Sequence, residues 1–367
     1  MRMVRIRTSS RAFIAAVRSA WSLSFNALMR PSCRQRNPIF TGDWREASPV
    51  SGMMCSVRRA AAASLSLLGL GAAGLGYAAV FERNWFRLRR FDVPVLEPGQ
   101  RPIRILHISD LHLTPRRTRL IKWVRSLDLL NPDLIVNTGD TIAHPDAVEA
   151  YLRAVEPLLE RPGVFVYGSN DLYAPHFKNP ARYLWRTSKG DVRRNTPDLP
   201  WEELGAAMTA AGWLDLNNKT ARLKVGDLDV HVGGIHDSHI DRDRYDEIAG
   251  QAPADADLRI GVMHSPEPRN LTRFADDGYD LLLAGHTHGG QICIPFYGAL
   301  VTNCGLDTAR VKGLSRHGRA WLHVSAGLGT SPYAPVRFAC PPEASLLTLV
   351  PRRPVGRARG TSTAKVR

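Results

Sequence analysis

The chain has 367 residues, of which 44% are hydrophobic and 8% aromatic, and its net charge is +15. This apolar content can build a hydrophobic core, so the composition excludes a fully disordered protein. The basic excess lies at the two ends: residues 1–59 hold eleven arginines and two acids, and residues 351–367 hold six basic residues and no acid. The central residues carry no net charge, and we therefore expect no nucleic-acid-binding surface on the folded body.

The first 59 residues show no sustained hydrophobic periodicity, and we expect them to be a basic segment that is disordered or precedes the true start. Met53 and Met54 stand directly before a stretch with the pattern of an amino terminus, two arginines followed by a long apolar run. Our hypothesis is that the protein starts at one of these methionines. At the other end, we expect residues 351–367 to form a basic disordered tail.

Residues 60–81 contain no charged side chain. As a helix they would span roughly 33 Å, close to the hydrocarbon thickness of a bilayer. We favour a transmembrane or signal-anchor helix over two alternatives, a cleaved signal peptide and a buried helix. Arginines flank both ends, so the positive-inside rule leaves the side of the membrane open. The pattern predicts a membrane-associated protein with a single amino-terminal span, lipid contacts through residues 60–81 and their basic flanks, and a linker over residues 82–100.

Beyond this linker, short apolar runs alternate with amphipathic stretches, which is typical of a layered α/β domain over residues 101–350. The predicted strands are Ile103–Ser109, Leu134–Thr138, Val164–Tyr167, Leu228–Gly233, Ile260–His264, Leu281–Ala284, Trp321–Ser325 and Leu346–Leu349. The predicted helices are Leu120–Leu130, Ala147–Leu159, Glu202–Ala211 and Glu267–Ala275. The intervening segment from His176 to Pro200 is predicted to be a long loop or insertion.

The chain lacks several common site patterns. Its five cysteines are odd in number and form no Cys-x-x-Cys pair, so neither a zinc ribbon nor a disulfide framework is indicated. The sequence also lacks a P-loop, a Gly-x-Ser-x-Gly elbow and a His-Glu-x-x-His helix. These absences weigh against an NTPase, a serine hydrolase and a metalloprotease.

Residues of metal-binding type follow the predicted strands directly. In chain order they are Asp110, His112, Asp140, Asn170, His264, His286 and His288. Strand ends at one edge of an α/β sheet are the usual place for a site, so these side chains are expected to converge. In the two pairs spaced i, i+2, an extended backbone would place both side chains on one face.

This mixture of side chains suits hydrolysis of a phosphate ester. The reaction requires the negative charge of the phosphate to be neutralised, and two cations about 3.5–4 Å apart do this while activating a water molecule. Carboxylates, imidazoles and an amide oxygen together suit Mn, Fe, Zn or Ni, and the sequence does not determine which. A lone histidine is usually structural, but paired histidines and aspartates at strand ends are hard to explain by packing alone.

Five blocks occur in a fixed order: Asp110-Leu-His112, Gly139-Asp140, Gly168-Ser-Asn170-Asp171, His264 and Gly285-His286-Thr-His288. In this order they resemble the calcineurin-like metallophosphoesterases, over roughly residues 101–350. The resemblance extends to the membrane-associated branch of that family, with its amino-terminal apolar segment and a run like Pro341-Pro342-Glu343. It implies an α/β fold, a layered α-β-β-α sandwich of the calcineurin-like phosphoesterase type, preceded here by one amino-terminal apolar helix.

The same resemblance implies a ligand set for two metal ions. Asp110, His112 and His288 would hold one ion, Asp140 would bridge, and Asn170, His264 and His286 would hold the other. Asp140, Asn170 and His264 would also be catalytic residues.

The third block departs from the family pattern. A gap-free reading puts Ser169 in the position of the ligand Asn, and Asn170 in the position of a His that assists leaving-group protonation or phosphate binding. We favour Asn170 as the ligand because an amide oxygen binds a metal better than a neutral hydroxyl, and Ser169 is the alternative. His176, Asp171 and His236 are candidates for the missing proton transfer, and spacing does not select among them.

The predicted function is metal-dependent hydrolysis of a phosphomonoester or phosphodiester, lipid-linked or nucleotide-linked, with a dinuclear metal site and a metal-bridging hydroxide as nucleophile. The predicted partners are the phosphoester substrate and membrane lipid. A membrane-tethered binding or scaffold protein with a degraded site is the alternative, motivated by the altered third block.

Overall fold

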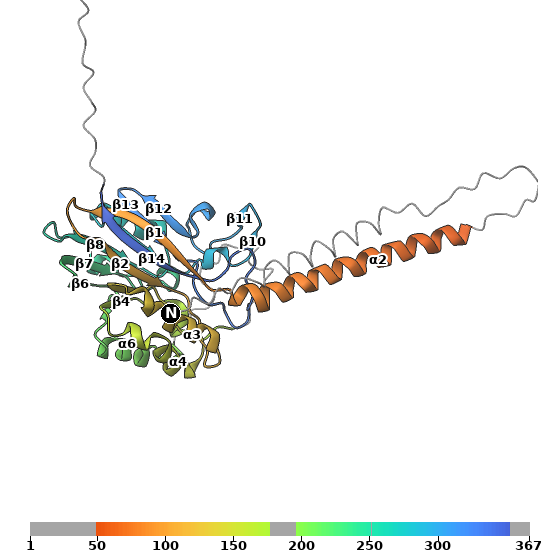
Figure 1. Cartoon of the computed structure of the whole chain (residues 1–367), viewed down its shortest axis with the longest axis horizontal. Coiled ribbons are helices and arrows are strands. Elements are labelled where there is room, and N and C mark those ends of the chain that lie inside the picture. The colour runs from red at the N-terminus through yellow and green to blue at the C-terminus, as the bar shows by residue number, and fades with distance from the viewer. Residues whose placement is uncertain (1–48, 177–195, 251, 353–367) are drawn as a thin grey trace, which may run out of the picture. The chain divides into compact units, whose positions relative to one another are not determined.

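The computed structural model describes residues 49–176, 196–250 and 252–352 (Figure 1). The chain divides into two units, Met1–Ser64 and Leu65–Arg367, and the α/β body belongs to the second. The predicted basic amino-terminal segment up to residue 48, most of the predicted insertion and the tail from residue 353 lie outside the described residues.

The predicted apolar span is helical. Helix α2 covers Pro49–Gly76 and continues through a π-helical turn, Tyr77–Phe81, and a 3-10 turn, Glu82–Asn84. Within the described residues, Ala61–Asn84 is the one stretch long and apolar enough to cross a membrane, judged by length and composition. Its leucines from Leu65 to Leu75 are exposed, as lipid-facing side chains would be.

The body contains two six-stranded sheets. The first has the order β1 (Arg87–Leu96), β14 (Glu343–Pro351), β2 (Ile103–Ile108), β3 (Leu134–Asn137), β4 (Gly163–Phe165) and β5 (Leu214–Asp215). The second has the order β12 (Gly313–His317), β13 (Ala320–Val324), β9 (Leu281–Ala284), β8 (Leu258–Val262), β7 (Leu228–Gly234) and β6 (Lys219–Val225). Strands β2 to β5 pair in parallel, as do β7, β8, β9 and β13, so the carboxyl ends of each set lie at one edge.

The two sheets pack face to face through β-branched and leucine side chains contributed by both, such as Ile105 and Val136 from the first and Val230 and Ile260 from the second. Helices α3 (Thr118–Arg125), α4 (Val148–Val155) and α6 (Trp201–Ala210) pack with the outer face of the first sheet. Helix α7 (Pro268–Asp276) packs with the second. The predicted α-β-β-α sandwich is confirmed.

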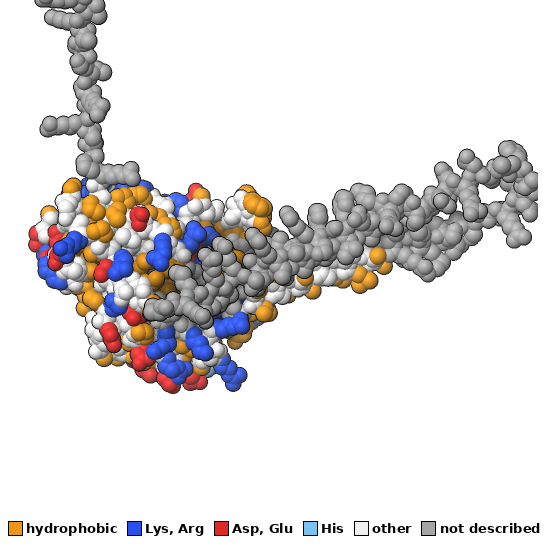
Figure 2. Space-filling view, in the orientation of Figure 1, with side chains coloured by type: hydrophobic (Ala, Val, Ile, Leu, Met, Phe, Trp, Pro, Cys, Tyr) orange, Lys and Arg blue, Asp and Glu red, His pale blue; other side chains and the backbone are white. Residues whose placement is uncertain are grey.

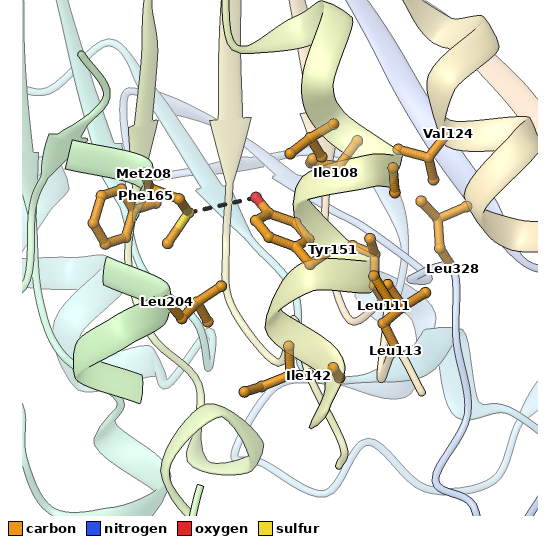
Figure 3. Close-up of a cluster of buried hydrophobic side chains, with 14 of the residues drawn as sticks. Ile108, Leu111, Leu113, Val124, Ile142, Tyr151, Phe165, Leu204, Met208 and Leu328 are labelled. Atoms are coloured by element: carbon orange, nitrogen blue, oxygen red, sulfur yellow. Dashed lines mark hydrogen bonds between the residues drawn. The ribbon is translucent and has the colours of Figure 1, made fainter. Parts of the chain in front are cut away.

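Figure 3 shows the interior beneath α4 and α6. Tyr151 of α4 is fully buried, and its hydroxyl lies 3.4 Å from the sulfur of Met208 on α6. The amide of Asn137, at the end of β3, also donates to this hydroxyl. The same amide donates to the hydroxyl of Thr141. Asn137 therefore connects Tyr151 of α4 to the loop that follows β3.

All eight predicted strands and all four predicted helices are present, with ends shifted by a few residues. The linker prediction over residues 82–100 is wrong, because Arg87–Leu96 forms β1 and pairs in parallel with β14. We also missed β5, β6, β12 and the short hairpin of β10 (Cys293–Ile294) and β11 (Gly298–Ala299). Strands β1 and β6 lie at sheet edges and carry exposed Arg and Lys side chains, so their sequences do not read as half-buried strands.

Two buried histidines connect the sheets. The Nδ1 atoms of His107 on β2 and His323 on β13 are 2.9 Å apart, and Nε2 of His107 lies 2.9 Å from the hydroxyl of Thr138. Burial lowers the pKa of His107 well below its ordinary value and that of His323 to about 3, so both rings are neutral at physiological pH. These two histidines therefore have a structural role between the sheets.

The surface of the body carries both signs of charge. On the face shown in Figure 2, Lys and Arg side chains are interspersed with Asp and Glu. The described residues also pair many of these charges, as in Arg222 with Asp229 and Arg259 with Asp280. The two signs of charge are thus mixed on this face.

Candidate metal centre

The candidate ligands lie in loops that directly follow parallel strands. Five of them have a positive φ angle: Asp110 (50°), His112 (42°), Asp140 (52°), His286 (70°) and His288 (50°). Non-glycine residues rarely adopt this left-handed conformation, and such strain concentrates at functional sites. We expected the two i, i+2 pairs to lie on extended backbone, and this prediction is wrong. Left-handed turns, and not strand alternation, bring each pair together.

Asp110, His112, Asp140 and His288 form one half of the centre. Each offers a ligand atom, and these atoms lie within 4.8 Å of one another. Nε2 of His112 is 3.0 Å from Nε2 of His288 and 3.4 Å from Oδ2 of Asp140, and Nε2 of His288 is 3.6 Å from Oδ1 of Asp110. Burial lowers the pKa of His112 to about 4 and that of His288 well below its ordinary value, so neither ring readily becomes a cation.

Asp140, Asn170, His264 and His286 form the other half. The backbone N–H of Asn170 donates to Oδ1 of Asp140 at 2.8 Å, and its side-chain amide lies 2.7 Å from Oδ2. Nε2 of His264 is 3.4 Å from the same Oδ2. Oδ2 of Asp140 therefore lies between His112 of the first half and His264 of the second, where a bridging carboxylate oxygen would be.

The ring nitrogens of His264 and His286 test whether this second half fits a cation. Nδ1 of His264 donates to the carbonyl of Thr138 at 2.6 Å, and Nε2 of His286 donates to the carbonyl of Asn303 at 3.2 Å. In the neutral rings, the remaining nitrogens, Nε2 of His264 and Nδ1 of His286, carry lone pairs and face each other at 3.3 Å. Two facing lone pairs repel unless a proton or a metal ion lies between them. The donor set of two carboxylates, four imidazoles and one amide accordingly fits divalent metal ions.

The electrostatics lead to the same conclusion. Burial raises the pKa of Asp110 to about 6, with a further contribution from the nearby charge of Asp140. Burial alone would also raise the pKa of Asp140, but His264 outweighs it and holds that pKa well below its usual range. Conversely, burial disfavours a charged His264, and Asp140 overrides this and raises the histidine pKa. A cation at the centre would replace the proton on which this pair depends.

Two glycines of the sequence blocks are explained by close approach to the carboxylates. A Cβ atom on Gly168 would lie 2.2 Å from Oδ1 of Asp140, and one on Gly285 would lie 1.9 Å from Oγ of Ser109 and 2.6 Å from Oδ2 of Asp110. Oγ of Ser109 donates to this Oδ2 at 2.5 Å. Any larger residue would push these carboxylates out of place.

The third block forms a short helical turn, α5 (Ser169–Leu172), that presents Asn170 to Asp140. Asp171 is fully buried and accepts from the backbone N–H groups of Gly168, Thr141 and Ile142. Burial and the charge of Asp140 raise the pKa of Asp171 to about 7. All of its polar contacts are with the two loops that carry Asp140 and Asn170, so it positions the site and is poorly placed to reach a substrate.

Replacing Asn170 by alanine is expected to lower metal affinity by at least about 10- to 100-fold, the effect typical of losing one supporting group at a metal site. The reason is that Asn170 is the side chain of this block that contacts Asp140. Metal content and competition titration with a chromogenic chelator measure the effect. Ser169→Ala is the matched control and should retain metal. The reverse pattern, loss with Ser169→Ala alone, would make the serine the ligand.

Two residues near the centre were missed. The ring of His239 lies with its centroid 4.7 Å from that of His286. Arg337 is fully buried, and its Nη2 is 3.2 Å from Nδ1 of His288 and donates to the carbonyl of Gly329. His239 follows a strand within the run Gly-Gly-Ile-His-Asp-Ser-His, which is a usable signal. The sequence around Arg337 carries none, because one arginine in a proline-rich loop is unremarkable.

The other candidates for proton transfer differ in their surroundings. His236 is buried, and its Nδ1 accepts from the backbone N–H of Asp237 at 2.7 Å. Burial lowers its pKa to about 4. Its ring packs at 5.9 Å from that of Tyr167, on the side of the first sheet. Among His236 and His239, it is His239 that contacts a ligand ring.

Comparison with known proteins agrees with this geometry. Residues 103–290, more than half of the chain, match the family described as calcineurin-like phosphoesterase. The chain is 27% identical over 281 residues to the uncharacterized metallophosphoesterase YkuE of Bacillus subtilis, covering 75% of this chain and 90% of that protein.

Two further relatives have more specific names. The phosphodiesterase YaeI of Escherichia coli is 27% identical over 291 residues, covering 76% of this chain and 93% of YaeI. The UDP-2,3-diacylglucosamine pyrophosphatase LpxG of Chlamydia trachomatis is 25% identical over 313 residues, covering 74% of this chain and 91% of LpxG. With five ordered motif blocks converging on one buried centre and a family match over residues 103–290, the chain belongs to the calcineurin-like phosphoesterases and is a metallophosphoesterase.

Proposed function

We propose that this metallophosphoesterase hydrolyses a phosphomonoester or phosphodiester with two divalent metal ions held by Asp110, His112, Asp140, Asn170, His264, His286 and His288. The observation that carries the proposal is the close approach of Nε2 of His264 and Nδ1 of His286, 3.3 Å apart, beside Oδ2 of Asp140, which also lies near the His112 and His288 pair. Two cations would neutralise the phosphate charge and lower the pKa of a water molecule between them.

The protein groups would hold this centre in place. Asp140 would contribute a carboxylate oxygen to both halves, and the Asn170 backbone N–H would fix its orientation. The carbonyls of Thr138 and Asn303 would keep the ring tautomers of His264 and His286 that leave a nitrogen free toward the cations. His239, at the ring of His286, is the histidine placed to take over part of the role of the one missing from the third block.

A lipid-linked or nucleotide-linked ester near a membrane is the proposed substrate. The apolar segment ending at Asn84 supports membrane association. The names of two relatives, a phosphodiesterase and a pyrophosphatase of a diacylglucosamine nucleotide, support an ester of this kind. The metals would be Mn, Fe, Zn or Ni, the ions that such a mixed donor set accepts.

The test is hydrolysis of p-nitrophenyl phosphate, bis-p-nitrophenyl phosphate, nucleotide esters and phospholipids by the full chain with added Mn²⁺. We expect turnover of at least one ester, its loss on chelation and its recovery when metal is restored. Elemental analysis of the purified protein identifies the native ions. If metal binds but no ester is hydrolysed, the non-catalytic scaffold becomes the better explanation, since the third block lacks its usual histidine.

Membrane attachment is tested by deletion, and contacts of residues 78 and 82 with the body set where the deletion should end. The carbonyl of Ala78 accepts from the N–H of Arg337, and the carboxylate of Glu82 accepts from the N–H of Cys340. Deletion of residues 1–76 should therefore release the protein from membranes with turnover of a soluble ester retained, whereas deletion to residue 84 should also destabilise the body. Sedimentation with membranes and thermal unfolding measure the two effects. Continued membrane sedimentation of the shorter deletion would contradict a single span.

A further inference from the structure

Three arginines lie beside the first half of the metal centre: Arg83, Arg117 and Arg337. Arg117 precedes α3, five residues after His112, and its Nη2 atom is buried without a hydrogen-bond partner. Neither Arg83 nor Arg117 forms an ion pair with any of the residues that the structure describes. Burial and the positive charges of Arg83 and Arg337 lower the pKa of Arg117 to about 10, so these guanidinium groups act on one another.

The same groups are connected to the ligand Asp110. Nε of Arg83 donates to the hydroxyl of Thr330 at 3.1 Å, and Nη2 of Arg337 donates to the carbonyl of the neighbouring Gly329 at 2.7 Å. The N–H of Gly329 in turn donates to the carbonyl of Asp110 at 2.6 Å. The positive charge of Arg117 also contributes to lowering the pKa of His112. Arg337 thus contacts His288 directly, and Arg83 is bonded to the residue that follows Gly329, which contacts Asp110.

The bonding of the three arginines differs. Both Nη atoms of Arg337 donate to carbonyls, those of His288, Ala326, Gly327 and Gly329, and its buried Nε has no partner. Arg117 has an unused buried donor, and Arg83 uses only Nε. A buried donor without an acceptor is costly, and guanidinium groups match the oxygens of phosphate in a two-pronged geometry. An anion at Arg117 would offset both the unused donor and the repulsion between the arginines.

We propose that Arg117, with Arg83, forms an anion subsite for a second phosphate of the substrate while the scissile phosphate occupies the metal centre. The substrate class is then an ester with two linked phosphate groups, such as a pyrophosphate diester, and not a simple monoester. This inference rests on the proposed function. It places the second phosphate beside Arg83, in the stretch that ends the apolar segment, and so fits a lipid-linked pyrophosphate whose acyl part stays in the membrane.

The subsite is tested first by binding. Inorganic pyrophosphate is titrated calorimetrically into the full chain in nanodiscs after removal of metal by chelation. Arg117→Ala should weaken binding at least about tenfold, because a charge-assisted contact is lost, and Arg117→Lys should weaken it less. Arg116→Ala, at the exposed neighbouring arginine, is the matched control and should bind as wild type does. Equal binding by Arg117→Ala and wild type, or no binding by wild type, would overturn the subsite.

Kinetics then distinguish this proposal from the proposed function. In metal-loaded protein, Arg117→Ala should raise KM for a pyrophosphate diester at least about tenfold more than it raises KM for bis-p-nitrophenyl phosphate, which has a single phosphate, and Arg116→Ala should change neither KM. An equal loss on both esters would assign Arg117 a general structural role. Pyrophosphate binding that depends on Arg117, without hydrolysis of any ester, would retain the subsite and reject the proposed function.

A second surface is carried by a different observation. The β10–β11 hairpin and its flanks expose Ile292, Ile294, Phe296, Tyr297 and Leu300. Phe296 at the turn is fully exposed, and Tyr297 is 76% exposed. Residues 289–306 contain no Asp, Glu, Lys or Arg. An apolar hairpin tip of this size on a globular body marks a surface that is covered in use.

The hairpin is connected, through Arg337 and Phe338, to the turn that ends the apolar segment. The N–H of Cys293 donates to the carbonyl of Phe338 at 2.8 Å, and the ring of Phe338 packs against that of Tyr77 with centroids 6.3 Å apart. The neighbouring N–H of Arg337 donates to the carbonyl of Ala78. Because the segment that these bonds reach is the candidate membrane span, we infer that the hairpin lies against the lipid bilayer. Its Phe and Tyr suit the headgroup boundary.

This contact is tested by placing a tryptophan at the hairpin tip. In full-length protein reconstituted with brominated phosphatidylcholine, the added emission of Phe296→Trp should be quenched at least about twofold, as for a ring at the lipid boundary. Leu129→Trp, at another exposed leucine, is the control and should not be quenched. Absence of quenching at residue 296 would overturn the contact. A concentration-dependent dimer that Phe296→Asp abolishes would instead assign the surface to a second copy of the chain.

Discussion

Asp140→Ala is expected to abolish phosphoesterase activity and to lower metal content at both halves of the centre. Asp140 is almost fully buried, and its Oδ2 lies 3.4 Å from both His112 and His264. Its removal takes away the one carboxylate shared by the two halves and leaves His264 without its counter-charge. Turnover should fall more than about 100-fold, beyond the effect of losing an outer-shell partner. Elemental analysis and hydrolysis of bis-p-nitrophenyl phosphate measure the two losses on the same sample.

The losses of metal content and turnover in Asp140→Ala are compared with those in a second aspartate variant. Asp146→Ala removes a carboxylate whose side chain is 82% exposed, and metal content and turnover should stay at the wild-type level. Folding of Asp140→Ala is checked by thermal unfolding without metal. Without metal, Asp140 pairs with His264 and accepts from the backbone N–H of Asn170, so the metal-free variant should unfold at a lower temperature than metal-free wild type, in a transition that is still cooperative. A variant that keeps full metal content would contradict the bridging position of Asp140.

Arg337→Met is expected to destabilise the body by at least about 3 kcal/mol, because several buried carbonyls lose a charged donor at once. The side chain is fully buried and donates to the carbonyls of His288, Ala326 and Gly329. These carbonyls belong to the loops that carry the ligand His288 and flank Asp110. Methionine fills much of the volume, so the loss measures hydrogen bonding and charge more than cavity formation.

Chemical denaturation measures the change in stability, and metal titration measures the coupled change at the centre. Arg319→Met is the control, since Arg319 is exposed, and its free energy of unfolding should change by less than about 0.5 kcal/mol. Arg337→Lys keeps the charge but has too few donors to replace the guanidinium, so it should restore only part of the stability. Wild-type stability of Arg337→Met would show that the loop carbonyls find other partners.

The order of the candidate metal ligands along the chain was readable because each follows a short apolar run. Parallel strands end at a common edge, so Asp110 could be placed beside Asp140 on the first sheet, and His264 beside His286 on the second. The apolar segment over residues 60–81 and the α-β-β-α layering follow from hydrophobic patterning in the same way. These features depend on residue type and local period, which a sequence carries directly.

Other features arise only from contacts between distant segments. The left-handed backbone of Asp110, His112, Asp140, His286 and His288 is imposed by the surrounding loops and has no local signature in those residue types. The edge strand over Arg87–Leu96 forms because β14, some 250 residues later, offers it a partner, and its arginines conceal the pattern of a strand.

The third block shows the boundary between the two kinds of information. Spacing alone left both Ser169 and Asn170 open, and the turn of α5 brings Asn170 onto Asp140. Arg337 and His239 likewise gain their positions from loops that meet only in the folded chain. The sequence by itself determined the fold class, the chemistry of the ligands and their order. The tertiary structure decided which neighbours orient them, because hydrogen bonds and strain between segments far apart in the chain have no local code.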